Sequence, residues 1–199
     1  MADAPRSFLF LLGSARTGGN TERLARAAAE HLEPAAERRW IHLGELGLPP
    51  FTDRRHIGSG RTPPAEGPER TLQDATLAAT DIVIASPLYW YSVSATVKTY
   101  LDDWAGWLRV PGLDFRARMA GRRLWGVTAQ ADEGPGAAAP LVGTLRSTAG
   151  YMGMEWRGVL VGTGSKPGDV DRDERALRAA KTFFTDAAAV PAATADVRY

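Results

Sequence analysis

The residues best suited to chemistry lie in two short segments, each of which directly follows an apolar run. The first is GSARTGGNT, residues 13–21, which follows SFLFLL at 7–12. A glycine-rich turn that leads into a helix directs several backbone N–H groups to one point, where the helix dipole adds a partial positive charge. A monophosphate fits such a turn, and polar side chains add donors. The binding residues predicted in this segment are Ser14, Arg16, Gly19, Asn20 and Thr21.

Two common nucleotide-binding motifs do not fit this segment. Gly13 and Gly18 have the spacing of a P-loop, but Gly19 and Asn20 stand where Lys and Ser or Thr are needed. The dinucleotide fingerprint G-x-G-x-x-G is absent as well. The alternative to a phosphate site is a tight turn capped by Asn20. Glu22, in the first helical turn, opposes an anion site unless its side chain faces solvent.

The second segment is SPLYWYS, residues 86–92, which follows DIVIA at 81–85. Three large aromatic residues in a row after a buried strand cannot all point into a core. Such a cluster suits packing against a flat π-system whose polar edge is bound by backbone groups. The alternatives are an aromatic plug over the core and a dimer interface. The predicted binding residues here are Pro87, Leu88, Tyr89, Trp90, Tyr91 and Ser92.

The composition excludes several other kinds of site. The chain has no cysteine, which rules out disulfides, a thiol nucleophile, zinc–thiolate sites and cysteine-bound iron–sulfur clusters. Its three histidines, at positions 31, 42 and 56, match no metal spacing, so neither a metal site nor a catalytic side chain is predicted. Lys and Arg number 24 against 23 Asp and Glu, which argues against nucleic-acid binding. No run is long enough to cross a membrane and no export signal is visible, so we expect a cytoplasmic protein.

The periodicity along the chain predicts how these segments are positioned. Short apolar strands are expected at 7–12, 39–43, 81–86, 122–128 and 156–161, and they alternate with five helices. The helices are expected over 24–32, over 69–79, from a cap at Ser92 or Ser94 to about 108, over 141–151, and from about Val170 onward, with a loose tail at the end. A long loop at 44–67 separates the second strand from the second helix. This pattern predicts one α/β domain over residues 1–199, with a doubly wound, five-stranded parallel sheet.

Both segments resemble motifs of a known family. GSARTGGNT together with SPLYWYSVSATVKTYLDDW is similar to the NAD(P)H-dependent FMN reductase branch of the flavodoxin-like superfamily. The resemblance implies a sheet order of 2-1-3-4-5, with FMN held by these loops and NAD(P)H as the reductant. It also implies a homodimer or homotetramer. In that family the loop after the fourth strand, here Thr128–Asp132, closes the other side of the flavin ring, which adds Thr128, Ala129 and Gln130 to the predicted binding residues.

The resemblance implies an oxidoreductase in which NAD(P)H reduces the flavin. The reduced flavin would then pass electrons to a small acceptor such as a quinone, an azo or nitro compound, or free flavin. Some relatives carry an iron–sulfur cluster on cysteines after the second strand, a subtype that this cysteine-free chain excludes. Two rival interpretations remain. One is a flavodoxin-like electron carrier without NAD(P)H turnover, and the other is a regulatory or interaction module that has lost the flavin.

Overall fold

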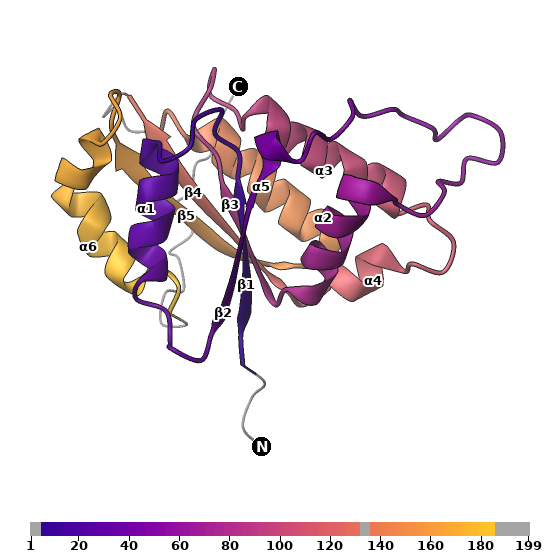
Figure 1. The fold of residues 1–199 in the computed structure, drawn as a ribbon, viewed down its shortest axis with the longest axis horizontal. Coiled ribbons are helices and arrows are strands. Elements are labelled where there is room, and N and C mark those ends of the chain that lie inside the picture. The colour runs from indigo at the N-terminus through magenta and orange to yellow at the C-terminus, as the bar shows by residue number, and fades with distance from the viewer. Residues whose placement is uncertain (1–4, 132–135, 186–199) are drawn as a thin grey trace.

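A parallel sheet of five strands forms the centre of the molecule, and helices cover both of its faces (Figure 1). The computed structural model describes residues 5–131 and 136–185. The strand order is β2-β1-β3-β4-β5, which is the order implied by the family resemblance. The strands are β1 (Ser7–Leu12), β2 (Glu37–His42), β3 (Asp81–Ala85), β4 (Arg123–Gln130) and β5 (Glu155–Thr163).

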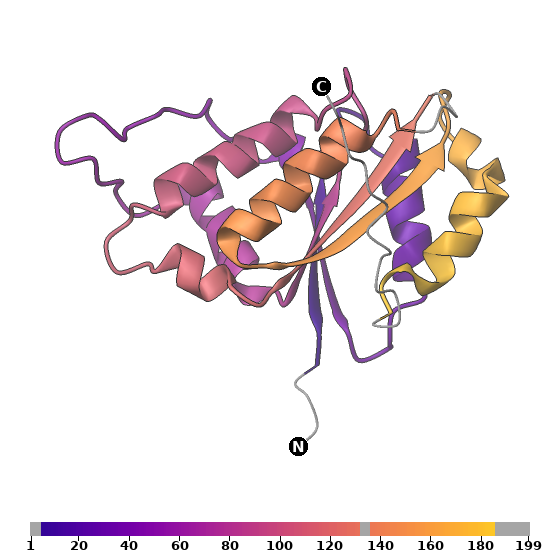
Figure 2. The same ribbon diagram turned by 180° about the vertical axis from the view of Figure 1, so that it is seen from behind.

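The helices divide between the two faces (Figures 1 and 2). Side chains of successive residues in β1 alternate between two cores, as the pleat of a strand requires. Phe8 and Phe10 pack with α1 and α6, whereas Leu9 and Leu11 pack with α2, α3 and α5. The helices are α1 (Asn20–Ala29), α2 (Gly67–Ala78), α3 (Ala95–Trp107), α4 (Phe115–Met119), α5 (Ala139–Met152) and α6 (Glu174–Phe183), with short 3-10 turns η1 (Leu43–Glu45) and η2 (Asp169–Arg172).

All five predicted strands are confirmed, and the differences lie at the ends of elements. β2 begins at Glu37, two residues before its predicted start. β4 continues through Gln130 and does not end at Thr128, since Leu88 N–H donates to Ala129 O and Gly164 N–H donates to Gln130 O. The ladder on both sides therefore extends this strand into the predicted loop.

The helix predictions need three corrections. α1 ends at Ala29, before the predicted limit at residue 32. The last helix begins at Glu174 and not near Val170, because Val170 lies in η2 and the Asp173 side chain caps α6 by accepting from Ala176 N–H at 2.9 Å. The pattern also missed α4, which is five residues long and too short to show a period. Of the two caps predicted for α3, Ser92 and Ser94, the structure has Ser94, whose hydroxyl accepts from Val97 N–H.

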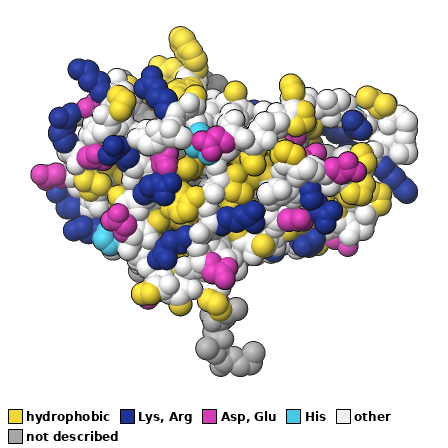
Figure 3. Space-filling view, in the orientation of Figure 1, with side chains coloured by type: hydrophobic (Ala, Val, Ile, Leu, Met, Phe, Trp, Pro, Cys, Tyr) yellow, Lys and Arg dark blue, Asp and Glu magenta, His cyan; other side chains and the backbone are white. Residues whose placement is uncertain are grey.

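The predicted loop at 44–67 is confirmed as a surface loop. After η1, residues 46–66 contain no helix or strand, and they project away from the sheet as an arm (Figure 1). On the face shown in Figure 3, positive and negative side chains are interspersed, as the near-balanced composition requires. None of the helices in the described ranges is long and apolar enough to span a membrane. The predicted loose tail lies outside the described residues.

Candidate functional site

The loops that follow β1, β3, β4 and β5 meet at one end of the sheet, where the strands have their carboxyl ends. Open α/β sheets bind ligands at this edge. A cavity of about 240 Å³ lies there, and we call it the strand-end pocket. Its lining residues are Ser14, Arg16, Gly19, Asn20, Thr21, Pro87, Leu88, Tyr89, Ala129, Ala131, Gly164, Ser165 and Pro167.

The loop after β1 presents its backbone donors to this pocket. Helix α1 begins at Asn20, with Gly19 in extended conformation as its N-cap. Amide groups at a helix start have no partner within the helix and are available to an anion. Within residues 5–131 and 136–185, no acceptor pairs with the backbone N–H groups of Ser14, Ala15, Thr17, Gly19, Asn20 and Thr21. These amides are available as donors, and phosphate binding by this loop stays a prediction.

Glu22 does not oppose an anion here, although it is buried and does not face solvent. Its carboxylate accepts from Gly18 N–H at 2.7 Å and pairs with Arg26 at 2.7 Å. Burial acts to raise the pKa of Glu22, but these two partners together hold the pKa below its usual value. The charge of Glu22 is thus matched by Arg26, and its side chain closes the turn at Gly18.

Asn20 has a different role from the predicted one. Its side chain ties the start of α1 to the loop after β5, where Nδ2 donates to Lys166 O at 2.9 Å and Oδ1 accepts from Gly168 N–H at 2.8 Å. The loop comes so close that a Cβ on Gly164 would lie 2.8 Å from Asn20 Nδ2. The Asn20 side chain is therefore engaged within the protein, which leaves its backbone N–H to face a ligand.

The loop after β5 is the part of the pocket that the sequence analysis did not assign to ligand binding. Gly164, Ser165 and Pro167 line the pocket, yet none is among the predicted binding residues. The available signal was GTGSKPGDV, residues 162–170, which follows the fifth strand. Glycines after a strand also occur for purely structural reasons. Only the contact with Asn20 shows that this loop belongs to the site.

The aromatic segment forms a tight two-residue hairpin turn. Tyr89 and Ser92 exchange both backbone hydrogen bonds, at 3.2 and 3.0 Å. The two residues between them have positive φ angles, 48° for Trp90 and 64° for Tyr91. Asn and Gly favour this turn, and bulky residues in this conformation cost on the order of 1–3 kcal/mol each. Trp90 is 94% exposed and Tyr91 is 59% exposed, so the strain displays both rings to solvent.

The strand-end pocket brings together nine of the fourteen predicted binding residues. Trp90, Tyr91 and Ser92 belong to the exposed turn and do not line it. The predicted loop at Thr128–Asp132 is wrong for its first three positions, Thr128 to Gln130, which belong to β4, and of these Thr128 and Gln130 do not line the pocket. The nine that line it are Ser14, Arg16, Gly19, Asn20, Thr21, Pro87, Leu88, Tyr89 and Ala129.

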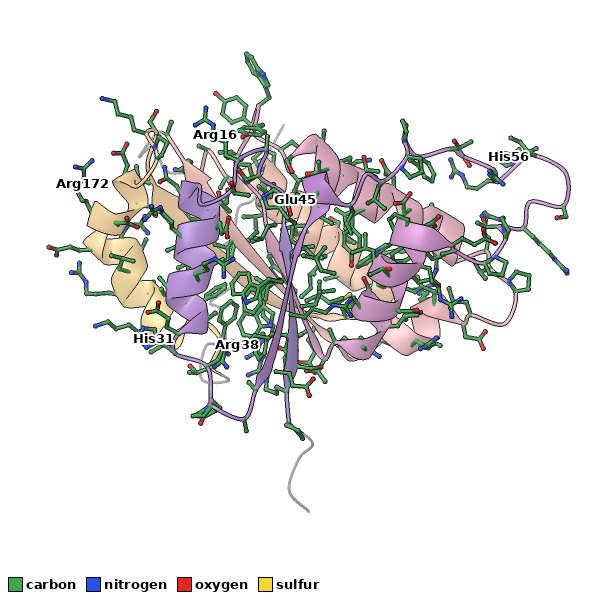
Figure 4. All side chains as sticks on the ribbon, in the orientation of Figure 1. Arg16, His31, Arg38, Glu45, His56 and Arg172 are labelled. Atoms are coloured by element: carbon green, nitrogen blue, oxygen red, sulfur yellow. The ribbon has the colours of Figure 1, made fainter. Side chains whose placement is uncertain are left out.

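The charged side chains labelled in Figure 4 are spread widely over the molecule. Arg16 lies at the pocket end of the sheet, His31 and Arg38 lie at the opposite end, and His56 lies on the arm (Figure 4). Asp132, which was predicted in the loop after β4, lies outside the described residues. In the described ranges, no group of three or more His, Cys, Asp or Glu side chains could hold a metal ion.

A second cavity of about 240 Å³, which we call the arm pocket, lies between the arm and helices α2 and α3. Charged side chains dominate its lining. Burial, followed by the nearby charges of Glu69 and Asp102, raises the pKa of Asp103 to about 7. Glu69 accepts from the indole N–H of Trp107 at 2.8 Å. The charged lining residues are Asp53, Arg54, Arg55, Glu69, Asp103 and Arg109.

Comparison with known proteins gives a consistent result. A family model described as a flavodoxin-like fold matches residues 6–184. The chain is 31% identical over 173 residues to YwqN of Bacillus subtilis (strain 168), which carries the provisional name of an NAD(P)H-dependent FMN-containing oxidoreductase, and the match covers 86% of this chain and 93% of YwqN.

Solved structures share the same fold. The Trp repressor binding protein from Bacillus subtilis superimposes with a TM-score of 0.71 at 26% identity, over 90% of this chain and 98% of that one. The apo form of an NADH:FMN oxidoreductase, EmoB, gives a TM-score of 0.61 at 22% identity, over 89% of this chain and 88% of that one. The second likeness is one of fold alone.

Proposed function

The chain belongs to the flavodoxin-like fold family, and from this premise we propose that it is an FMN-dependent oxidoreductase that uses NAD(P)H to reduce a small acceptor. The observation that carries the proposal is a set of four backbone N–H groups that have no protein acceptor in the described ranges and belong to residues lining the strand-end pocket: those of Ser14, Gly19, Asn20 and Thr21. A terminal phosphate needs such a group of donors. The match to YwqN, whose name describes an FMN-containing oxidoreductase, supports FMN as the molecule that carries this phosphate.

The residues of the pocket form two sides, one for the phosphate and one for the flavin ring. On one side, the free amides of Ser14, Gly19, Asn20 and Thr21 and the Arg16 guanidinium would hold the phosphate. On the other, Pro87, Leu88 and Tyr89 border the planar ring, with Ala129 nearby on β4. The exposed rings of Trp90 and Tyr91 lie on the turn next to this border.

When held by these residues, FMN would supply the redox chemistry, namely hydride transfer from NAD(P)H and electron transfer to the acceptor. The protein contributes position and the exclusion of water. No titratable side chain of the described ranges lines the pocket apart from Arg16 and the half-exposed Tyr89. We therefore assign no acid–base residue to the reaction.

The cofactor and the reductant can be tested together. The purified protein should be yellow or should take up added FMN, and anaerobic NADPH or NADH should bleach its absorbance in the visible range. A colourless protein that does not bind FMN would instead favour a flavin-free interaction module. Bound FMN that neither nicotinamide reduces would favour an electron carrier.

We propose a quinone, an azo or nitro compound, or free flavin as the acceptor. Aromatic side chains at the mouth of the pocket suit planar molecules of this kind. Steady-state oxidation of NAD(P)H with each acceptor ranks them by kcat/KM. No turnover with any of the four would contradict the enzyme assignment.

We also propose that two copies of the chain associate. A groove of about 730 Å³ lies between α3 and α5, with an apolar floor that includes Leu101, Trp104 and Leu108. Tyr151, on its edge, is 60% exposed. A second copy of the chain would cover this apolar floor and the exposed Tyr151 ring. Light scattering on the purified protein distinguishes a monomer, a dimer and a tetramer.

A further inference from the structure

The phosphate side and the ring side of the strand-end pocket are in direct contact at Gly13. Gly13 N–H donates to Ala85 O, at the end of β3, at 2.9 Å. A Cβ at Gly13 would lie 2.3 Å from Val97 Cγ2 and 2.7 Å from Ser94 Oγ, so no side chain fits between the two loops. The first loop is therefore packed directly against the start of α3.

Three hydroxyl groups, together with the backbone of Ser94, connect the two loops. The Ser86 hydroxyl donates to Pro87 O at 3.0 Å and accepts from Ser94 N–H at 2.9 Å. Ser94 Oγ lies 3.1 Å from Thr96 Oγ1. Thr96 Oγ1 in turn donates to Gly13 O at 3.0 Å. Ser86 is fully buried and Ser94 is 4% exposed.

The Gly13 carbonyl oxygen at one end determines which hydroxyl donates and which accepts in each of these hydrogen bonds. A carbonyl oxygen only accepts, so the single hydroxyl hydrogen of Thr96 is committed to Gly13 O. The Ser94 hydroxyl must then donate to Thr96, while it accepts from Val97 N–H at 3.4 Å. Each of the three hydroxyls thus donates once and accepts at least once, and such chains are cooperative.

We propose that Thr96 is a positioning residue, which fixes the phosphate-binding amides relative to the turn that borders the flavin ring. This rests on the proposed function, because it concerns the same pocket. The Gly13 carbonyl belongs to the peptide whose N–H is that of Ser14, the first donor of the phosphate loop. When Thr96 fixes the plane of that peptide, it sets the direction in which the Ser14 N–H points.

The test compares two ligands that differ only in the phosphate. Thr96→Val keeps the shape of the side chain but loses both hydrogen bonds. We expect the Kd for FMN to rise about tenfold, the factor expected when one hydrogen bond to the ligand, here that from Ser14 N–H to the phosphate, is lost. The Kd for riboflavin should change less than twofold. Thr96→Ser restores the hydroxyl and should bring FMN binding within threefold of the wild type.

Thr99→Val is the matched control on the same helix, because the Thr99 hydroxyl donates only to Ala95 O within α3. It should leave both affinities unchanged. Equal weakening of FMN and riboflavin by Thr96→Val would overturn the proposal, since a general loss of structure has that effect. An unchanged FMN affinity in Thr96→Val would overturn it as well.

A measurement on the wild-type protein covers the case in which Thr96→Val does not fold. FMN should slow amide hydrogen exchange across residues 13–21 and at the start of α3, residues 94–97, whereas riboflavin, which has no phosphate, should slow exchange in these two segments less. Equal slowing by FMN and riboflavin would overturn the proposal. Failure of the wild type to bind any flavin would instead refute the proposed function, so the two failures are distinguishable.

Discussion

The strand-end pocket and the arm pocket have the same volume, about 240 Å³, but their linings differ in kind. Backbone amides, small residues and one aromatic side chain dominate the first. The second is lined by three arginines, three carboxylates and a cluster of prolines. Size alone does not identify the binding site. The direction of the donors does, because amides fixed by the fold bind an anion without rearrangement.

The two pockets also differ in how they are held. The strand-end pocket is held in place by glycines that have no room for a Cβ and by side chains that lie between its loops. One wall of the arm pocket is a long segment without helix or strand, which is attached to the residues just after α3 by the bond from Thr62 N–H to Arg109 O at 3.2 Å. Substitutions in the first pocket should therefore affect stability and flavin binding together, whereas those in the second should affect stability alone.

Gly13→Ala should have the largest effect of the substitutions considered. The added methyl group has no space beside Val97, so we expect a loss of about 3 kcal/mol in the free energy of unfolding, the upper end for overpacking. FMN binding should weaken at least tenfold. Urea denaturation and a flavin titration measure the two effects.

The control for this change is Gly143→Ala in α5, where nothing lies within 4 Å of the new Cβ. It should stabilise the helix by up to about 1 kcal/mol and leave FMN binding unchanged. If Gly13→Ala changed the free energy of unfolding and FMN binding as little as Gly143→Ala does, the tight contact between the two loops would not exist in solution.

Asn20→Ala should have the next largest effect. It removes both hydrogen bonds to the loop after β5, which should cost about 2 kcal/mol of unfolding free energy and weaken FMN binding. Asn20→Asp keeps the acceptor for Gly168 N–H and should lose about half as much stability. Its new charge at the phosphate site should nevertheless weaken FMN binding. If Asn20→Ala were as stable as the wild type, the loop after β5 would not be held at the site by Asn20.

Asp103→Asn tests the arm pocket through its pH dependence. The folded-state pKa of Asp103, about 7, lies above its ordinary value of 3.8. Between these values the folded protein binds more protons than the unfolded chain, so stability falls as pH rises from about 4 to 7. Asp103→Asn should abolish that decline and be more stable than wild type at pH 8 by about 1 kcal/mol, a figure reduced for solvent screening of a half-buried group.

Thermal unfolding at pH 5 and pH 8 measures this difference, and FMN binding should not change. Asp74→Asn, in an exposed ion pair with Arg70, is the control and should shift stability by less than about 0.5 kcal/mol at either pH. Loss of FMN binding in Asp103→Asn would show that the two pockets are not independent.

The smallest effect is expected at the strained turn. Trp90→Asn combined with Tyr91→Gly supplies the residues that positive φ angles favour, so unfolding free energy should rise by about 1 kcal/mol. FMN affinity should fall if the two rings border the flavin. An unchanged affinity would restrict the ring side of the pocket to Pro87, Leu88 and Tyr89.

Much of the fold and one side of the site could be predicted from the sequence. Apolar runs bounded by turn residues marked the central strands β1, β3 and β4, because a strand buried on both faces has few polar side chains. The edge strands β2 and β5 were found from shorter apolar runs that include charged residues. The glycine-rich loop after the first strand was correctly identified for a similar reason, since its conformation depends on local backbone freedom. The end of β4 at Gln130 was missed because its pairing comes from Leu88 and Gly164, which are distant in sequence.

Local sequence therefore determined the parallel α/β class, the positions of its strands and the two loops most suited to a flavin. Tertiary structure decided which residues face the pocket, that Asn20 binds a neighbouring loop, and that Trp90 and Tyr91 project into solvent. The physical reason is the range of the interactions concerned. Periodicity and turn preference act over a few neighbouring residues, whereas the direction of a side chain at the pocket depends on segments more than a hundred residues away, such as Gly168 beside Asn20.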